Sequence, residues 1–155
     1  RTGGLTYFDE QLNAKLLGLL DDCLVIDEGG PSPAKAGSGQ VARYYVPLDY
    51  KTRGWEPKED SSDFYQHQLD IYEFLLQANG MATKGMGYLV YYHPLEVREN
   101  GVVQFEVTPK AMKTNPQNAK KLFEEAVKLL QTDEIPKPSA KCEFCPWGQR
   151  QGEYV

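Results

Sequence analysis

The chain has 155 residues, of which 41% are hydrophobic, and it carries a formal net charge of −5 at pH 7. This length supports one domain with its own hydrophobic core and is too short for two, so we expect residues 1–155 to form a single domain whose C-terminal tail is residues 136–155. No apolar run approaches the length of a membrane span and no signal-peptide pattern is present, which excludes an integral membrane protein and predicts a cytoplasmic location.

The first predicted element is an apolar, strand-like run from Lys15 to Asp27 with two acids near its middle. Asp21 shares the alternation phase of its apolar neighbours, and an unpaired carboxylate on such a face is costly. A cation or a hydrogen-bond donor is therefore its expected companion. The alternative is a surface hairpin with Asp21 and Asp22 at its bend. Cys23, in the same run, is expected to be a small buried residue.

A stretch rich in glycine and proline, Gly29 to Gln40, predicts a flexible hairpin connection to a second strand that contains the sequence Asp49-Tyr50-Lys51. Side chains two apart on a strand share a face. Asp49 and Lys51 therefore point into one site, while Tyr50 turns away and leaves its carbonyl free to face that site. A metal-dependent phosphodiester hydrolase needs an acid and a carbonyl to hold a divalent cation, and a lysine beside the attacking water.

This acid-x-Lys pattern is unspecific when it stands alone. Glu56-Pro57-Lys58 also matches it, but Pro57 cannot donate to a sheet ladder, so that copy is interpreted as a loop. The pattern at Asp49 therefore depends on what the neighbouring elements contribute.

The residues from Ser61 to Asn79 predict a helix with an apolar stripe, ended by Gly80. Gln68 and Tyr72 lie four apart and share one face of this helix. Tyr72 is equally well explained as a core aromatic residue with a satisfied hydroxyl. His67 points off that face and is interpreted as a surface histidine. The candidates for the N-cap are Asp60, Ser61 and Ser62.

The rest of the chain predicts strands over Gly85–His93 and Val102–Val107, separated by a turn at Glu99-Asn100-Gly101. A helix capped by Asn115 follows and extends to about Gln131. The order strand, strand, helix, strand, strand, helix predicts an α/β fold with a mixed central sheet flanked by helices.

Three segments together resemble one family. Gly18-Leu19-Leu20-Asp21, Asp49-Tyr50-Lys51 and Gln68-Leu69-Asp70-Ile71-Tyr72 resemble the successive G-x-x-D, D-x-K and Q-x-x-x-Y motifs of the PD-(D/E)XK nuclease superfamily, in its RecB-like exonuclease branch. This branch includes the nuclease domains of bacterial helicase-nuclease repair machines and the CRISPR-associated exonuclease of spacer acquisition. The resemblance covers most of the chain and implies a restriction-endonuclease-like fold.

The resemblance implies that Asp21 and Asp49 bind Mg²⁺ or Mn²⁺, with the backbone carbonyl of Tyr50 as a further ligand. Lys51 is implied to orient or help deprotonate the attacking water and to stabilise the charged transition state. Asp22 is either a neighbouring acid that assists, or the ligand itself if the strand phase is shifted by one residue.

The resemblance also bears on the Q-x-x-x-Y motif and on the residues before Asp21. Gln68 and Tyr72 are implied to brace the site or to contact the DNA backbone. The superfamily core begins with a helix that often supplies another site residue, and this helix is expected to be absent or short, since the residues before Asp21 start a helix poorly. Asp9 and Glu10 are weak candidates to substitute for it.

A basic stretch from Lys35 to Lys58 contains five basic residues against two acids. Such local charge attracts phosphates even in an acidic chain, so Arg43, Arg53 and Lys58 are expected to bind nucleic acid. The alternative for such a run is a solvated face.

Cys142 and Cys145 form a C-x-x-C-P stretch that resembles part of the iron-sulfur motif found in many RecB-like members. That motif needs four cysteines, whereas this chain has three, and Gln151 stands where the last cysteine belongs. An iron-sulfur cluster is therefore not expected. The pair is a remnant, one edge of a site completed elsewhere, or a plain thiol pair.

Two functions remain in view. The first is a metal-dependent DNA nuclease, expected to act as an exonuclease on single-stranded or end-bearing DNA in repair, recombination or phage and CRISPR defence. The second is a catalytically silent nuclease-like module that binds DNA or a partner, such as a helicase, within a larger assembly. The Asp21, Asp49 and Lys51 set favours the enzyme, since a structural domain has no reason to keep costly buried charges.

Overall fold

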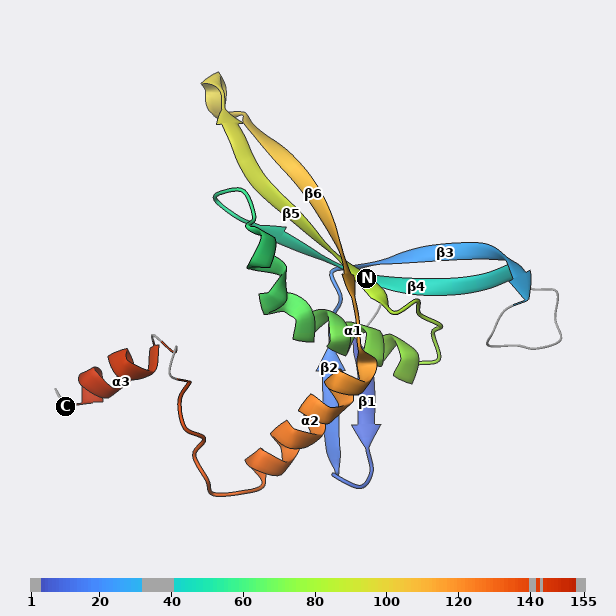
Figure 1. Cartoon of the computed structure of the whole chain (residues 1–155), viewed down its shortest axis with the longest axis vertical. Helices are drawn as coiled ribbons and strands as arrows, with labels where there is room; N and C mark the ends of the chain where they lie inside the picture. The colour runs from blue at the N-terminus through green and yellow to red at the C-terminus, as the bar shows by residue number, and fades with distance from the viewer. Residues whose placement is uncertain (1–3, 32–40, 140–141, 143, 153–155) are drawn as a thin grey trace.

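The computed structural model describes residues 4–31, 41–139, 142 and 144–152. Its centre is a four-stranded mixed sheet in the order β3-β4-β5-β6, in which β4 and β5 are parallel and the two outer pairs are antiparallel (Figure 1). The predicted mixed sheet flanked by helices, consistent with a restriction-endonuclease-like fold, is confirmed. The strands are β3 (Asp22–Pro31), β4 (Val41–Thr52), β5 (Met86–Val97) and β6 (Val103–Lys113).

The N-terminal region corrects one prediction. The apolar run from Lys15 to Asp27 is not one strand, because its first part pairs elsewhere: β2 (Ala14–Gly18) forms a separate antiparallel hairpin with β1 (Leu5–Asp9). Asp21 lies in the bend that leads from this hairpin to β3. The alternation phase expected through Asp21 is therefore interrupted, and within the described residues no helix precedes β3.

The last residue of the hairpin, Gly18, lies close to the helix α1 (Gln66–Ala78). A Cβ atom at Gly18 would lie only 2.4 Å from the Leu75 side chain, so any larger residue would force the Leu75 side chain or the hairpin to move. Cys23, expected to be buried, is half-buried in β3. The predicted connection from Gly29 to Gln40 is shorter than expected, because β3 continues to Pro31; residues 32–40 lie outside the described part of the chain.

The helix predicted from Ser61 begins later than expected. A 3₁₀ helix, η1 (Glu59–Tyr65), precedes α1 (Gln66–Ala78). None of the predicted N-cap residues serves that role, because the capping positions are Lys58 and Tyr65 and neither makes a side-chain capping bond. The predicted end of the helix is confirmed, since Gly80 adopts φ of +78°, a conformation that favours glycine.

The helix α1 packs on one face of the sheet. Leu69 and Tyr72 form the buried core with Leu89 and Tyr91 of β5. Burial of these apolar side chains stabilises the fold by removing their surface from water, by about 1.5–3 kcal/mol for each fully buried one. The core therefore fixes the position of the helix face that carries Tyr72.

Two buried acids fix α1 on its other side. Asp70 accepts hydrogen bonds from Asn115 N at 2.8 Å and from Asn118 Nδ2 at 2.8 Å. Glu73 accepts from Gly85 N at 2.8 Å and from the Thr114 hydroxyl. Both carboxylates are satisfied, so they anchor the helix to the end of β6.

The predicted second helix is confirmed as α2 (Pro116–Leu130), with the Asn115 side chain accepting from the first helical N–H groups. The predicted turn between β5 and β6 is also confirmed, with positive φ at Asn100 and Gly101. A third helix, α3 (Phe144–Gly152), was not predicted. In the described part of the chain no helix is long and apolar enough to cross a membrane.

Candidate active site

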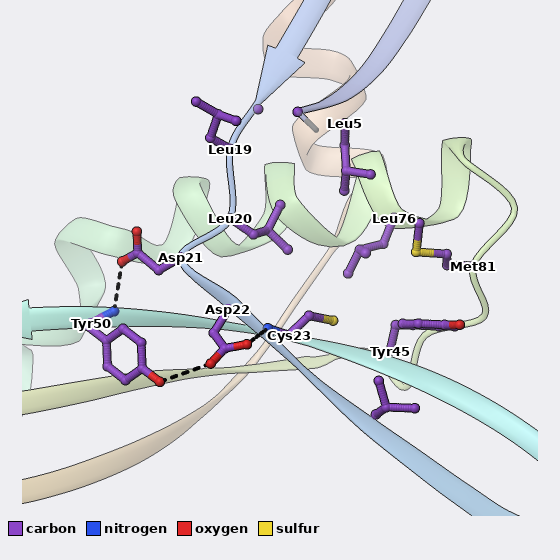
Figure 2. A pocket seen from close by; sticks show the side chains of 13 residues that line it. Leu5, Leu19, Leu20, Asp21, Asp22, Cys23, Tyr45, Tyr50, Leu76 and Met81 are labelled. Atoms are coloured by element: carbon purple, nitrogen blue, oxygen red, sulfur yellow. Dashed lines mark hydrogen bonds between the residues drawn. The ribbon is translucent and has the colours of Figure 1, made fainter. Parts of the chain in front are cut away.

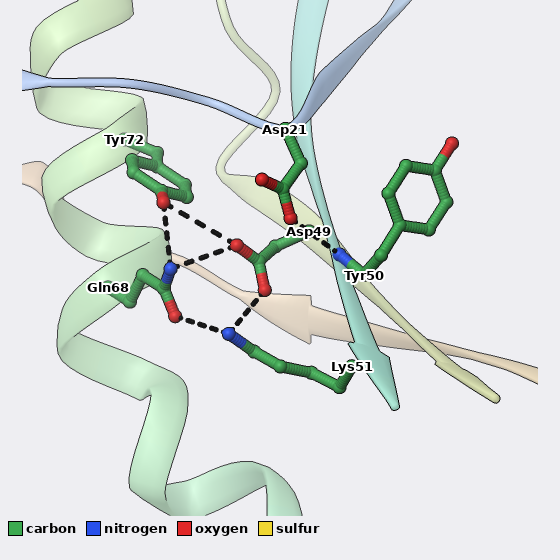
Figure 3. A network of polar contacts seen from close by, with 6 residues as sticks. All are labelled: Asp21, Asp49, Tyr50, Lys51, Gln68 and Tyr72. Carbon is green, nitrogen blue, oxygen red and sulfur yellow. Dashed lines mark hydrogen bonds and ion pairs between the residues drawn. The ribbon is translucent and has the colours of Figure 1, made fainter. Parts of the chain in front are cut away.

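Asp49 lies at the centre of a polar network on the face of the sheet that α1 covers (Figure 3). It sits on β4 opposite Leu89 and is only 2% exposed. Its Oδ1 accepts a hydrogen bond from Gln68 Nε2 at 2.9 Å and lies 3.5 Å from the Tyr72 hydroxyl. The network therefore joins Asp49 of β4 to residues of α1 that lie 19 and 23 positions later in the sequence.

Lys51 approaches the other oxygen of Asp49. Its Nζ forms an ion pair with Asp49 Oδ2 at 2.5 Å. Within the described residues this buried oxygen has no other partner. Lys51 Nζ also donates to Gln68 Oε1 at 2.9 Å and lies 4.2 Å from the centroid of the Tyr65 ring. The ammonium is thus held from three sides.

Gln68 and Tyr72 are linked to each other as well. Gln68 Nε2 lies 2.7 Å from the Tyr72 hydroxyl, as expected for residues four apart on one helix face. The predicted convergence of these two side chains with Asp49 and Lys51 is what the structure shows (Figure 3). His67, also on α1, is exposed as expected and contacts Asn118.

Asp21 completes the cluster from the bend before β3. Its Oδ2 accepts the backbone N–H of Tyr50 at 3.1 Å, so the carboxylate is held against the same strand as Asp49 (Figure 3). Burial raises the pKa of Asp49, Lys51 opposes this shift, and the nearby Asp21 charge adds to it. A buried carboxylate that is repelled by a second, exposed one is the arrangement that a cation relieves.

Asp22, the alternative ligand, turns to the opposite side of β4. Its Oδ1 accepts from Cys23 N at 2.8 Å, and its Oδ2 accepts from the Tyr50 hydroxyl at 3.2 Å. Of the two neighbouring acids, the structure therefore places Asp21 beside Asp49, and Asp22 beside the Tyr50 ring.

The donor set fits one hard divalent cation. Carboxylate and carbonyl oxygens are the ligands that Mg²⁺ and Mn²⁺ prefer, and Asp49 Oδ2 is an oxygen without a hydrogen-bond partner. Among the described residues no three His, Cys, Asp or Glu side chains converge, so the two aspartates stand without a third acid. Asp9 does not supply one, because it is bound at the hairpin turn to the N–H groups of Gln11 and Leu12.

An open groove of about 1190 Å³ lies beside Asp21 (Figure 2). Apolar side chains from the hairpin and from the end of α1, such as Leu20 and Leu76, line one side of it, and Tyr45 and Tyr50 of β4 line the other. The groove therefore combines a polar rim at Asp21 and Asp22 with apolar and aromatic walls.

The predicted basic residues occupy different positions. Arg43 makes a bidentate pair with Asp27, at 2.7 and 3.0 Å, so its charge is matched locally. Arg53 lies directly after the end of β4 and donates from Nη1 to Ser61 Oγ at 3.1 Å. Lys58 is exposed in the loop that contains Pro57, as predicted for that segment, and Lys35 lies outside the described residues.

Cys142 and Cys145 lie together at the start of α3, with their Sγ atoms 2.9 Å apart. Both are free thiols. The hydrogen bond between the two thiols, together with the one that Cys142 Sγ accepts from the Cys145 backbone N–H, lowers the pKa of Cys142. Cys23 belongs to β3, in a different part of the fold.

Sequence reasoning missed two aromatic residues next to the site. Tyr65 lies over the Lys51 ammonium, and Tyr91 stands opposite Lys51 in the parallel register of β4 and β5. The strand that contains Tyr91 was predicted, but its register with β4 is a property of the sheet that no local pattern specifies.

Comparison with known proteins gives one family. A model of the PD-(D/E)XK nuclease superfamily matches residues 38–150, which is more than half of the chain. No curated protein matches the chain. The matched range contains Asp49, Lys51, Gln68 and Tyr72, and begins after Asp21.

Proposed function

The chain belongs to the PD-(D/E)XK nuclease superfamily, and we propose that it is a divalent-metal-dependent deoxyribonuclease of the RecB-like branch, acting as an exonuclease on single-stranded or end-bearing DNA. Nucleases of this superfamily generally use metals such as Mg²⁺ or Mn²⁺. The observation that carries the proposal is the Asp49 carboxylate, which is 2% exposed and lies between Lys51 and Asp21 with one oxygen lacking a hydrogen-bond partner.

The residues of the chain have distinct tasks in this proposal. Asp21, Asp49 and the Tyr50 carbonyl would hold the ion, which when bound lowers the pKa of a coordinated water and offsets phosphate charge. Lys51 is placed by Asp49 and Gln68 to orient the attacking water and to stabilise the negative charge that develops on the phosphate. Gln68 and Tyr72 hold the Asp49 carboxylate and the Lys51 ammonium in position. Precise positioning is a large part of phosphoryl-transfer catalysis.

The groove supports a single-stranded substrate. Unstacked bases bind to apolar and aromatic walls, and stacking on an aromatic ring tolerates any base. Tyr45 and Tyr50 line the groove next to Asp21, so a strand that enters the site has a surface for its bases close to the scissile phosphate. In this proposal Arg53 and Lys58 contact phosphates without reading sequence. We propose that the assembly served is one of DNA repair, recombination or defence, with a helicase or another subunit as partner.

One observation favours a second candidate, the catalytically silent module. Within the described residues only two carboxylates converge, without a third acid, and Lys51 already neutralises one of them. A domain of this kind would bind DNA or a partner and leave the strand intact.

Digestion of end-labelled DNA separates the two candidates. The purified chain is incubated with linear single strands, linear duplex and covalently closed circular duplex, in Mg²⁺, Mn²⁺ or chelator. The proposal predicts loss of linear strands that depends on the metal, with closed circles intact. Lys51→Ala should lose about 100-fold in rate, while Lys84→Ala, which removes a lysine paired with Glu28 away from the site, should keep the wild-type rate.

Two results would contradict the proposal. Binding of single strands without cleavage in either metal would identify the silent module. Discrete bands from closed circles, with linear single strands left intact, would identify a sequence-specific endonuclease.

A further inference from the structure

We propose that Arg53, Tyr91 and Ser61 form a second phosphate-binding subsite, which holds the phosphate that neighbours the scissile one along a single strand. The inference rests on the proposed nuclease function, because it places the scissile phosphate at Lys51. It adds a binding site made by residues that take no part in holding the metal.

The first observation is a buried hydroxyl with no partner. Tyr91 is 1% exposed, and within the described residues its Oη makes no hydrogen bond. Leaving such a group unsatisfied destabilises the fold, and native proteins rarely keep one without a reason. A phenylalanine would fill the same core position without this cost.

The second observation is the charge around that hydroxyl. Burial raises the pKa of Tyr91, while Arg53 acts in the opposite direction and Asp49 adds to the rise. Both charged groups therefore lie within electrostatic reach of the hydroxyl. Tyr91 is paired with Lys51 in the register of β4 and β5, and it packs in the same core cluster as Leu89.

The third observation is that Arg53 has no carboxylate as an ion-pair partner among the described residues. The Arg53 guanidinium carbon lies 5.6 Å from the centroid of the Tyr91 ring, and Nη1 donates to the buried Ser61 hydroxyl at 3.1 Å. No carboxylate forms an ion pair with Arg53 in the part of the chain that the structure describes. The backbone N–H of Arg53 is fixed to Tyr92 O at 2.8 Å, so the side chain starts from a rigid strand.

The spacing matches a nucleic-acid strand. Lys51 lies at the end of β4 and Arg53 directly after it. Two residues of extended chain separate Cα atoms by about 6.6 Å, comparable to the distance between neighbouring phosphates of an extended strand. Two of the groups at this position, the Arg53 guanidinium and the Tyr91 hydroxyl, can donate to an anion. His93 follows next along β5, with its Nε2 3.6 Å from the Glu106 carboxylate and its buried Nδ1 without a partner among the described residues. Donors around a cation fit an anion, and a phosphate offers several acceptor oxygens.

Binding without cleavage tests the subsite directly. The probe is a fluorescein-labelled single-stranded oligothymidylate, measured by anisotropy in EDTA. Arg53→Gln should raise Kd about tenfold or more, and Tyr91→Phe about threefold or more, as expected for lost hydrogen bonds to a charged group.

The matched controls are Arg98→Gln, which removes an equal charge at the distant β5–β6 turn where Arg98 pairs with Glu96, and Tyr92→Phe on the opposite face of β5. Both should bind within about twofold of wild type. Tyr91→Phe should melt at the same or a higher temperature than wild type, because it removes an unsatisfied hydroxyl. Wild-type affinity in Tyr91→Phe, or an equal loss in Arg98→Gln and Arg53→Gln, would overturn the subsite.

A cleavage experiment identifies which phosphate is held. Single strands in which one phosphate is replaced by a neutral methylphosphonate should be cut more slowly by the wild type at the linkage on one side of the replacement. Arg53→Gln should cut replaced and unreplaced strands at the same rate, because the partner of that phosphate is already gone. An equal penalty in both proteins would overturn the assignment. If the wild type cuts no strand, the proposed nuclease function fails, while the binding measurement still decides the subsite.

Discussion

The side-chain amide of Gln68 donates to Asp49 Oδ1 at 2.9 Å, and through its oxygen it accepts from Lys51 Nζ at 2.9 Å. One uncharged helix residue therefore contacts both members of the Asp-x-Lys pair, which face it from β4. The bridge keeps the carboxylate and the ammonium at fixed positions without adding charge to the site. It also explains why α1 must be anchored as firmly as Asp70 and Glu73 anchor it.

Replacing Gln68 with Leu should reduce cleavage by about tenfold or more, because two hydrogen bonds to charged groups are lost together. Tyr72→Phe should have a smaller effect, within about threefold, since its contact with Asp49 is long at 3.5 Å. Single-turnover rates of both variants on linear single strands check this. A Tyr72→Phe loss as large as that of Gln68→Leu would assign the hydroxyl a direct contact with substrate.

Metal binding should require both aspartates. We expect calorimetry to detect binding of Mn²⁺ to the wild type, and Asp49→Ala or Asp21→Ala to abolish it, because two carboxylates supply the charged ligands of the site. Asp27→Ala, which removes an acid paired with Arg43, is the control and should bind the ion normally. Retained binding in Asp49→Ala would contradict the site assignment.

The raised pKa of Asp49 predicts a pH-dependent cost to stability in the metal-free chain. A carboxyl whose pKa is higher in the folded than in the unfolded chain favours the fold while it is protonated, and this contribution is lost as pH rises through the interval between the two pKa values. Asp49→Asn removes that titration. Its melting temperature relative to wild type should therefore increase from about pH 4 to about pH 8, as measured by thermal denaturation in EDTA. A difference that does not change with pH would show that Asp49 has an ordinary pKa.

The two cysteines before and within α3 should remain a thiol pair. We expect the purified chain to lack the visible absorbance of an iron-sulfur cluster, because Cys142 and Cys145 supply two thiolates where four are needed, and both should react with a thiol reagent after reduction. Stoichiometric iron and acid-labile sulfide in an anaerobic preparation would contradict this.

Local patterns in the sequence determined several parts of this protein. Alternation on a strand places Asp49 and Lys51 on one face, and helical spacing places Gln68 next to Tyr72. The cap at Asn115 and the helix end at Gly80 are likewise set by residues within one turn of them. Each of these features depends on contacts between near neighbours in the chain, so it can be predicted from residue types and spacing.

Tertiary structure alone decided how these parts meet. Asp21 reaches the site from a bend, because the residues before it pair into a separate hairpin, and its carboxylate is held by the backbone of Tyr50, 29 residues later. The pairing of Arg43 with Asp27 and the position of Tyr91 opposite Lys51 depend on strand register. Register is fixed by the summed packing of whole strands against a helix, and no short segment of sequence contains that sum.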